Sequence, residues 1–383
     1  MKCKVYVEAH NIISPLGLTS DVNFTNLENG KSSIIEHNII LYDDEKFWAS
    51  IFKESTQFKI EEKDQPFGHF SKFEQLIICS IQTALESSNI NPTDKDVIII
   101  VSTTKGNIEL LELSRDPSFD VNLLKLNYSA NKIAQYFKNP NKPILVSNAC
   151  ISGVNAILLG KRLIEQGKYN HAIVVGGDTF SKFVYTGFKS FQALSKRKCA
   201  PFSKYRDGIN LGEAFGTICL TNQISEKTKV MVMGGATGND ANHISGPSRT
   251  GFELSQVINK TLLESKLQPQ QIDFISAHGT ATIYNDEMEA KAIKLSNLQH
   301  SKVNSLKGYF GHTLGAAGII ESIICVQSVL NKIILSTNGY EDQICDFEIN
   351  ISNNNLKQTI HHCLKIASGF GGCNSALIYS GFN

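Results

Sequence analysis

Short apolar runs alternate along the chain with longer stretches whose apolar residues recur at helical spacing. The runs predict buried strands, which read as near-continuous apolar segments; they cover residues 97–101, 142–149, 171–176, 272–276, 302–306, 364–367 and 375–379. The helical spacing predicts helices over 150–166, where Gly167 is the stop signal, and over 315–331. Strands that alternate with helices indicate an α/β fold.

A faint internal repeat divides the chain. The segment from Thr83 to Ser87 reads TALES and leads through a proline into the strand at 97–101. The segment from Thr261, 178 residues later, reads TLLES and leads through a proline into the strand at 272–276. Chance remains an alternative, because helix–loop–strand units resemble one another. The matching order of elements nevertheless favours a duplicated unit with two sets of loops around one site.

The repeat predicts two halves, residues 1–222 and 223–383, that pack as one body. The polar stretch 221–229 joins them and is too short to act as a free linker. Residues 107–141 fit neither half, and we interpret them as an insertion that forms a cap, a pocket wall or a subunit contact.

A cysteine stands where the predicted strand at 142–149 turns into the predicted helix. Cys150 follows the small residues Ser147, Asn148 and Ala149. The free backbone N–H groups and the positive end of the helix would favour its thiolate, which is the nucleophilic form. A lone cysteine is more often a small buried hydrophobe, so the functional interpretation depends on residues elsewhere in the chain.

Three further segments carry candidate chemistry. His278 and the threonines Thr280 and Thr282 follow the strand at 272–276, at an edge where α/β sheets bind ligands. Each histidine alone could equally be a structural one. Lys307 and His312 lie in a loop that opens onto a helix starting with small residues, which allow close approach.

The last segment is a glycine loop between the two final strands. Its sequence is Gly369-Phe370-Gly371-Gly372, and its glycines can present backbone N–H groups to an oxyanion. The same glycine-rich sequence would also fit a plain turn or a hinge.

Composition narrows the function classes. The chain has 383 residues and a net charge of +1, which gives no reason to expect nucleic acid as a partner. Its nine cysteines show no metal-type spacing, so we expect no metal site; an odd, dispersed set fits reduced thiols in the cytoplasm. No apolar stretch reaches the length of a membrane span, and no signal peptide is apparent at the N-terminus.

Together these segments resemble the condensing enzymes of the thiolase superfamily. The closest resemblance is to the elongating β-ketoacyl-acyl carrier protein synthases of fatty-acid and type II polyketide or polyene pathways. The main signal is His-Gly-Thr-Ala-Thr, beginning at His278, followed by Gly-His-Thr-Leu-Gly-Ala-Ala-Gly, beginning at Gly311. The resemblance extends over nearly the whole chain. It implies a thiolase-like fold whose duplicated βαβαβ halves form five layers, α-β-α-β-α.

The resemblance assigns expected roles position by position. Cys150 is the nucleophile, His278 and His312 are the catalytic histidines, and Lys307 is the active-site lysine. The resemblance makes Glu321, Asp286 and Glu289 supporting carboxylates and Phe370 the gatekeeper. It assigns Thr280 and Thr282 to contacts with the phosphopantetheine arm.

The resemblance also implies the reaction and the partners. Cys150 takes an acyl chain from a carrier protein, and malonyl-carrier protein then loses CO₂ and condenses with it. No cofactor is expected beyond the phosphopantetheine of the acyl carrier protein. We expect a homodimer, or a heterodimer with a subunit of the chain-length-factor type. The basic run Lys196, Arg197 and Lys198 is a candidate docking patch for an acidic carrier, although such a run is as often a solvated face.

Some positions depart from the family pattern and leave alternatives open. The segment from Lys105 to Pro143 looks short, which leaves acyl chain length and pathway undecided. A chain-length-factor subunit usually lacks the cysteine present here. A starter-type synthase would pair its cysteine with His and Asn, and a thiolase would need a second cysteine, for which Cys373 is available. A Cys–His acyl hydrolase would leave His312 and Lys307 unused.

Overall fold

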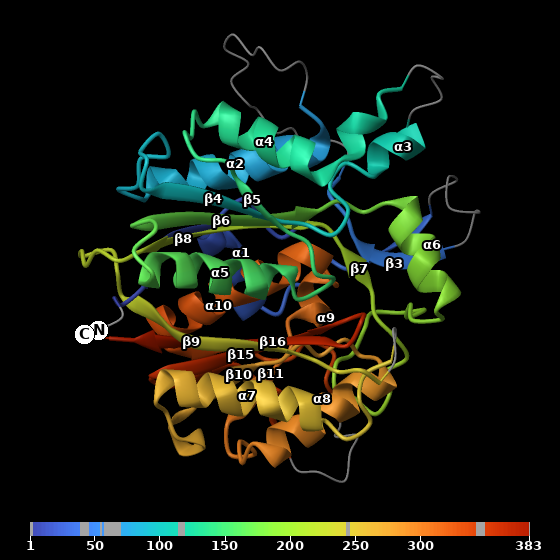
Figure 1. Ribbon diagram of the computed structural model, residues 1–383. Helices are drawn as coiled ribbons and strands as arrows, with labels where there is room; N and C mark the ends of the chain where they lie inside the picture. Colours follow the sequence, from blue (N-terminus) through green and yellow to red (C-terminus); the bar gives the residue numbers. More distant parts are fainter. Residues whose placement is uncertain are drawn as a thin grey trace.

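In the described part of the chain, an 11-stranded sheet forms two layers, which we call the N-terminal and the C-terminal sheet, and these alternate with three layers of helices (Figure 1). The computed structural model describes residues 3–38, 46–53, 56, 70–113, 119–242, 246–341 and 349–382. From outside to outside the layers run α-β-α-β-α, as the resemblance predicted. The alternation follows from apolar strands that must be covered on both faces.

The two sheets share one strand order. The N-terminal sheet runs β5 (Ile144–Val146), β4 (Val97–Ser102), β6 (His171–Asp178), β8 (Ala214–Thr221) and β1 (Tyr6–Ile13). The C-terminal sheet runs β11 (Lys302–Asn304), β10 (Phe274–Ser276), β15 (His362–Gly369), β16 (Cys373–Gly381) and β9 (Val230–Asn239), with β13 (Asn350–Ile351) outside β11. In both sheets the first three of these strands are parallel and the last two are antiparallel to their neighbours.

This shared order confirms the duplication predicted from the repeat. The helices that carry the repeat, α2 (Lys72–Glu86) and α7 (Phe252–Ser265), precede the equivalent strands β4 and β10. β1 and β9 pair briefly at Tyr6–Met231 and Val7–Val230, so hydrogen bonds join the sheets. The proposed boundary at 222/223 falls in the connection between β8 and β9, and as a boundary between folding units it remains a proposal.

Helices cover the outer faces of both sheets. α2 and α4 (Leu126–Tyr136) lie on the N-terminal sheet, and α7 and α8 (Ile283–Leu295) lie on the C-terminal sheet. α2 begins with a capping box, in which Ser71 accepts from the backbone N–H of Glu74 and Glu74 accepts from that of Ser71. Its apolar residues at helical spacing are fully buried against the sheet, namely Phe73, Leu76, Ile77 and Ile81.

The central layer contains α5 (Ser152–Glu165), α10 (Ala317–Asn331) and α1 (Ser20–Glu28) (Figure 1). α5 and α10 touch at their N-terminal ends, where Gly153 and Gly318 face each other. A Cβ on Gly153 would lie 2.7 Å from the Ile319 nitrogen, so only glycine permits this approach. Within the described residues, one helical stretch is apolar and long enough to cross a membrane, Leu314–Asn331, and 89% of it is buried inside the protein.

The insertion expected at residues 107–141 remains a prediction as a cap or a subunit contact. These residues form α3 (Glu109–Leu113), a 3-10 turn η2 (Val121–Leu124) and α4, with residues 114–118 outside the described part. α4 belongs to the outer helical layer, because its apolar residues Ile133 and Ala134 are buried in the same core cluster as α2. None of the described residues of this segment lines the catalytic pocket, so it supplies no pocket wall there.

Shorter elements complete the described chain and are β2 (Ile35–Asn38), β3 (Lys46–Ser50), α6 (Lys182–Ser190), β7 (Leu211–Gly212), η3 (Pro269–Gln271), α9 (Lys307–Phe310), η4 (Leu314–Ala316), β12 (Ile333–Ile334) and β14 (Leu356–Lys357).

Candidate active site

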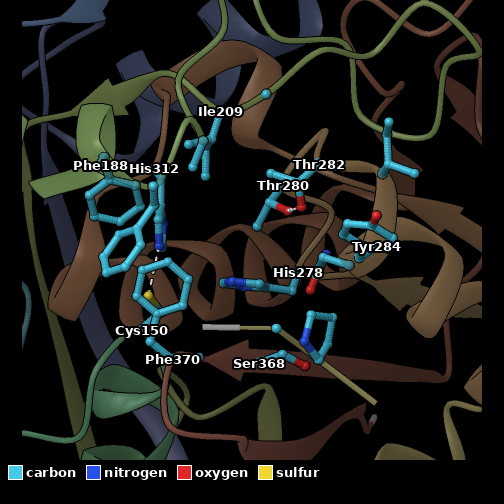
Figure 2. A pocket seen from close by; sticks show the side chains of 18 of the residues that line it. Cys150, Phe188, Ile209, His278, Thr280, Thr282, Tyr284, His312, Ser368 and Phe370 are labelled. Carbon is cyan, nitrogen blue, oxygen red and sulfur yellow. Dashed lines mark hydrogen bonds between the residues drawn. The ribbon is translucent and has the colours of Figure 1, made fainter. Parts of the chain in front are cut away.

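A cavity of about 480 Å³ lies at the C-terminal edge of the C-terminal sheet and contains the predicted chemical groups (Figure 2). Cys150, His278 and His312 line its inner end, and Tyr284 lies toward the other end. Cys150, the predicted nucleophile, comes from the N-terminal half, and both histidines come from the C-terminal half. The contact between α5 and α10 therefore assembles the site.

Cys150 sits on a sharp turn between β5 and α5. Ala149 adopts a left-handed backbone with φ of 43°, and Ile151 is the N-cap of the helix. A non-glycine residue with positive φ is strained, and such strain is typical of functional turns. The Cys150 thiol is buried, with 8% of the residue exposed.

The expected resting thiolate at Cys150 is contradicted. Burial raises the pKa of the Cys150 thiol to about 12, and the neighbouring Cys373 adds to the rise. The positive charge of Lys307 and the backbone N–H of Phe370 lower the pKa, but by less than burial raises it. A helix N-terminus favours a thiolate only where solvation is not lost at the same time. The thiol is therefore neutral at rest and needs a base to become a nucleophile.

His312 is placed to be that base. Its Nε2 atom lies 2.9 Å from the Cys150 Sγ atom. Gly311 sets the turn: its φ is 68°, and a Cβ there would lie 2.6 Å from the Leu211 carbonyl oxygen. Burial and then the positive charges of Lys307 and Lys365 lower the pKa of His312 well below its usual value, so its imidazole is neutral and can accept a proton.

His278 meets His312 at right angles across the cavity. Their ring centroids are 5.3 Å apart at an interplanar angle of 85°. One donor atom from each of Cys150, His278 and His312 lies within 4.8 Å of the other two. The same factors lower the pKa of His278, namely burial and then the charges of Lys307, His312 and Lys365. Two neutral imidazoles and a thiol thus point into one small space (Figure 2).

The backbone around His278 is held by charged side chains. Glu289 accepts from the backbone N–H groups of His278 and Gly279, each at 2.6 Å. Lys307 donates to the His278 carbonyl oxygen at 2.9 Å and also bonds to Glu321. The predicted lysine and carboxylates therefore lie beside the site and hold its frame.

The structure separates the roles of the three carboxylates. Burial would raise the pKa of Glu321, but Lys307 and Lys365 outweigh it, so its pKa falls below the usual value. Burial raises the pKa of Asp286 to about 6, and burial with the neighbouring Asp286 raises that of Glu289 to about 7. Asp286 accepts from the Phe202 backbone N–H at 2.8 Å and does not reach the imidazoles.

The glycine loop brings Phe370 over Cys150. Its ring stacks on Phe188 at 5.5 Å and 25°, and it meets Phe191 edge-on at 5.5 Å. Phe188 and Phe191 belong to the segment at the end of α6, whose spacing carried no chemical signal in the sequence. The 36% exposure of Phe370 fits a ring at the surface of the cavity rather than in the core.

The remaining predicted residues lie toward the cavity mouth. Thr280 and Thr282 both line the cavity, and their hydroxyl oxygens are 2.8 Å apart. Lys196, Arg197 and Lys198 are exposed and close in sequence to Ala193 and Asp207, which line the cavity. Arg197 pairs with Asp207 at 3.3 Å.

Family models match most of the chain. Residues 4–224 match the β-ketoacyl synthase N-terminal domain, and residues 230–341 match the β-ketoacyl synthase C-terminal domain. The chain belongs to the β-ketoacyl synthase family.

Curated relatives of this β-ketoacyl synthase are similar over different lengths. The putative polyketide beta-ketoacyl synthase 1 of Streptomyces cyaneus is 29% identical over 66% of this chain and 64% of that protein. The 3-oxoacyl-acyl-carrier-protein synthase 2 of Synechocystis is 28% identical over 99% of this chain and 98% of that protein. The chain thus spans slightly less than two thirds of the first relative and nearly all of the second.

Solved structures share the fold of this synthase. A ketosynthase from Xenorhabdus doucetiae, in complex with its chain length factor, has a TM-score of 0.90, 24% identity and coverage of 99% of this chain and 98% of that one. A beta-ketoacyl synthase from Burkholderia phymatum has a TM-score of 0.90 at 19% identity, with full coverage of both chains. At these identities the likeness shows the thiolase-like fold.

Two residues beside the synthase site, Lys365 and Asp178, carried no signal that the sequence analysis detected. Lys365 is completely buried and lies 2.7 Å from Glu321. Asp178, at the end of β6, accepts from the Gly315 N–H at 2.7 Å and from Thr103 at 2.7 Å, so it ties the loop after His312 to the N-terminal half. Cys373, which the sequence analysis named as the second cysteine that a thiolase would need, donates to the Phe370 carbonyl oxygen at 3.3 Å. Lys365 was missed because it lies within the apolar strand predicted at 364–367, whose pattern does not show that a charged side chain is buried there.

Proposed function

We propose that this synthase condenses an acyl chain held on Cys150 with malonyl-acyl carrier protein, releasing CO₂ and forming a 3-oxoacyl-acyl carrier protein. One observation carries the proposal. The Cys150 Sγ atom lies 2.9 Å from His312 Nε2, and the His278 ring lies beside the His312 ring on the same side of the cavity. A thiol, a base and a second imidazole donor are the groups that this reaction requires.

The acylation step uses Cys150 and His312. The thiol proton passes to Nε2 of His312, and the sulfur attacks the thioester carbonyl carbon of the acyl-carrier protein. The backbone N–H groups of Cys150 and Phe370 stabilise the oxyanion that forms. The carbonyl then re-forms, the carbon–sulfur bond to the carrier breaks, and the departing pantetheine sulfur takes the proton. One thioester is exchanged for another, so the step needs little driving force.

The condensation step uses both imidazoles. Malonyl-carrier protein loses CO₂, and the electron pair of the broken carbon–carbon bond forms an enolate. The Nε2–H of His278 donates to the enolate oxygen, and His312 donates to it in the tautomer that carries the ring proton on Nε2. The enolate carbon attacks the acyl carbonyl on Cys150, and the bond to sulfur breaks. The Cys150 thiolate then takes up one proton from solvent, which His312 can pass on because its Nε2 atom lies 2.9 Å from the sulfur. Neutral imidazoles can donate in this way, and the lowered pKa values of both histidines keep them neutral.

The carrier supplies the only prosthetic group the reaction needs. Thr280 and Thr282, at the cavity wall, would bind the phosphopantetheine arm through their hydroxyls. The exposed run at Lys196, Arg197 and Lys198 is the surface we assign to an acidic carrier protein. We assign no resident cofactor and no metal, since a metal at Cys150, His278 and His312 would occupy the groups that the reaction uses. The dispersed cysteines support a cytoplasmic location.

We propose that the working enzyme is a dimer. β5, which leads to Cys150, is the edge strand of the N-terminal sheet, and its residues Ile144–Val146 are only half-buried. An unpaired edge of this kind suits pairing with a second subunit. The second subunit is either a copy of this chain or a chain-length-factor-like partner. Acyl length and the choice between fatty-acid and polyketide or polyene pathways depend on that partner and on the pocket it completes.

The alternative functions are less well supported. A non-catalytic partner subunit would not need Cys150 together with two histidines. In a thiolase Cys373 would have to serve as a second catalytic thiol, but it bonds to the Phe370 carbonyl and is absent from the described cavity lining. In an acyl hydrolase the histidine paired with Cys150 would be His312, which bonds to the thiol, rather than His278 as the sequence suggested, and His278 would have no role.

Intact-mass analysis with acyl-carrier proteins of several chain lengths tests the proposal. We expect an acyl adduct on the wild type and none on C150A, with conversion to a product two carbons longer when malonyl-carrier protein is added. Absence of an adduct with every acyl group, both alone and with a co-expressed partner subunit, would refute the proposal. An adduct that releases free acid without condensation would favour a hydrolase.

A further inference from the structure

A second buried lysine lies behind the catalytic histidines. Lys365 is on β15, four residues before the glycine loop, and its side chain is 0% exposed. A buried ammonium group is costly unless it is fully paired. Its partners therefore indicate what keeps it there.

Most partners of Lys365 belong to the backbone before His278 or to the carboxylate that binds Lys307. Its Nζ atom donates to the carbonyl oxygens of Ser276 and Ala277, both at 3.1 Å, which directly precede His278. It also donates to the Ile366 carbonyl oxygen at 2.7 Å and lies 2.7 Å from Glu321 Oε2. Lys307 holds the next carbonyl, that of His278 itself, and binds the other oxygen of Glu321.

Two ammonium groups thus hold three consecutive carbonyl groups, and one carboxylate links the two. β10 ends at Ser276, so the carbonyls beyond it lack the ladder partners that a longer strand would provide. Lysine heads replace those partners. With two cations and one anion, the cluster also leaves net positive charge beside both imidazoles.

We propose that Lys365 is a positioning residue for His278, which anchors the backbone before the imidazole and, through Glu321, holds Lys307 in place. The inference rests on the proposed condensation and assigns to Lys365 a role specific to its decarboxylation half. Lys365 does not touch the Cys150 thiol, so loss of its contacts leaves the first, acylation half largely intact at neutral pH.

The charge of Lys365 provides a second readout. The charged and titratable groups around the two imidazoles are Cys150, Lys307, Glu321, Glu289, Asp178 and Lys365, together with the imidazoles themselves. A nearby cation disfavours the imidazolium, and removing one of two cations therefore raises the pKa of His312. Acylation needs a neutral His312. The acid limb of the pH profile of acylation should therefore move to higher pH when Lys365 is replaced.

The test compares K365M and K365Q with K161M in the same enzyme. Lys161 is a matched control because it is equally buried, at 1% side-chain exposure, and pairs with Glu165 and Glu264 away from the site. K365Q keeps a donor for the carbonyls without the charge, so it serves if K365M folds poorly. Each variant is assayed below its own melting temperature for acylation, for CO₂ release from malonyl-carrier protein, and for the pH dependence of acylation.

We expect both Lys365 variants to lose about 10- to 100-fold in CO₂ release, since small displacements of a reacting group cost this much. Acylation at pH 8 should change less than about threefold, and its acid limb should move upward in pH. The role of Lys365 would be overturned if its variants lost equally in acylation and in CO₂ release and the acid limb of the pH profile of acylation did not move. This is the result expected of K161M if that substitution only destabilises the protein. A wild type that does not acylate would instead overturn the proposed function.

Discussion

At the scale of single residues, the two histidines differ in what they contact. The imidazole of His312 bonds to the Cys150 thiol, whereas the hydrogen bonds of His278 in the described part of the chain are made by its backbone, and its ring faces the space proposed for the enolate. We expect H312A to slow acylation by about 10²–10⁴-fold, the usual worth of a general base. H278A should slow CO₂ release to a similar extent and acylation by less than about tenfold. Intact mass measures the first step and CO₂ release the second; equal acylation defects in both variants would contradict this division.

The neutral thiol of Cys150 predicts an unusual pH dependence of alkylation. Only the thiolate reacts, and below the pKa its fraction rises tenfold for each pH unit. With a pKa of about 12, iodoacetamide labelling of Cys150 should be slow at pH 7 and should increase about tenfold per unit to pH 10 without a plateau. C373A is the control, because burial also raises the pKa of that neighbouring thiol, to about 11. A plateau near pH 7 would show a thiolate paired with an imidazolium instead.

At the scale of elements, the contact between α5 and α10 sets the distance between nucleophile and base. The Cβ of an alanine at Gly153 would press on the Ile319 nitrogen and on the Gly318 Cα atom, 3.0 Å away. We expect G153A to cost about 1–3 kcal/mol of unfolding free energy, as overpacking does, and to slow acylation by separating Cys150 from His312. Urea unfolding and intact mass measure the two effects.

G187A supplies the matched control for this helix contact. Gly187 lies within α6, and nothing surrounds a Cβ built there within 4 Å. Alanine in a helix interior is favoured over glycine by about 1 kcal/mol, so G187A should be neutral or stabilising. If G153A proved as harmless as G187A, the close packing of the central helices would not be what positions the site.

At the scale of the whole molecule, the charge distribution matters more than the net charge of +1. The exposed Lys196 and Lys198 lie near the cavity mouth, where a carrier protein must approach. We expect K196E/K198E to raise the KM for acyl-carrier protein by about 2- to 10-fold, with kcat unchanged, because rim charges act mainly on encounter. The wild-type KM should also rise with salt.

Lys168 offers a control for the docking prediction. It is exposed just beyond the C-terminal end of α5, about 20 Å from Cys150 by the rise of the helix. K168E changes the net charge in the same direction as each patch substitution, and it should leave KM unchanged. An equal rise in KM for K168E would mean that overall charge, rather than the patch, governs the encounter.

Much of the fold and the site could be predicted because their signals are local. The strands at 97–101 and 171–176 are continuous apolar runs, and the site histidines lie in motifs that the family shares. The thiolate at Cys150 was a wrong prediction because the helix end is a local feature, whereas burial of the thiol depends on every element that covers it. The place of residues 107–141 was left open for a related reason, since the packing of α4 on α2 depends on contacts between segments far apart in the chain.

By itself the sequence determined the α/β alternation and the duplicated order of elements, which follow from periodicity along the chain. The roles proposed for Cys150, His278 and His312 came from the motifs that carry the family resemblance. Only the tertiary structure decided which groups meet: Cys150 with His312 through the packing of Gly153 on Gly318, Phe188 with Phe370, and Lys365 with Glu321. The physical reason is that charge pairing, burial and close packing depend on distances in space, which separation along the chain does not encode.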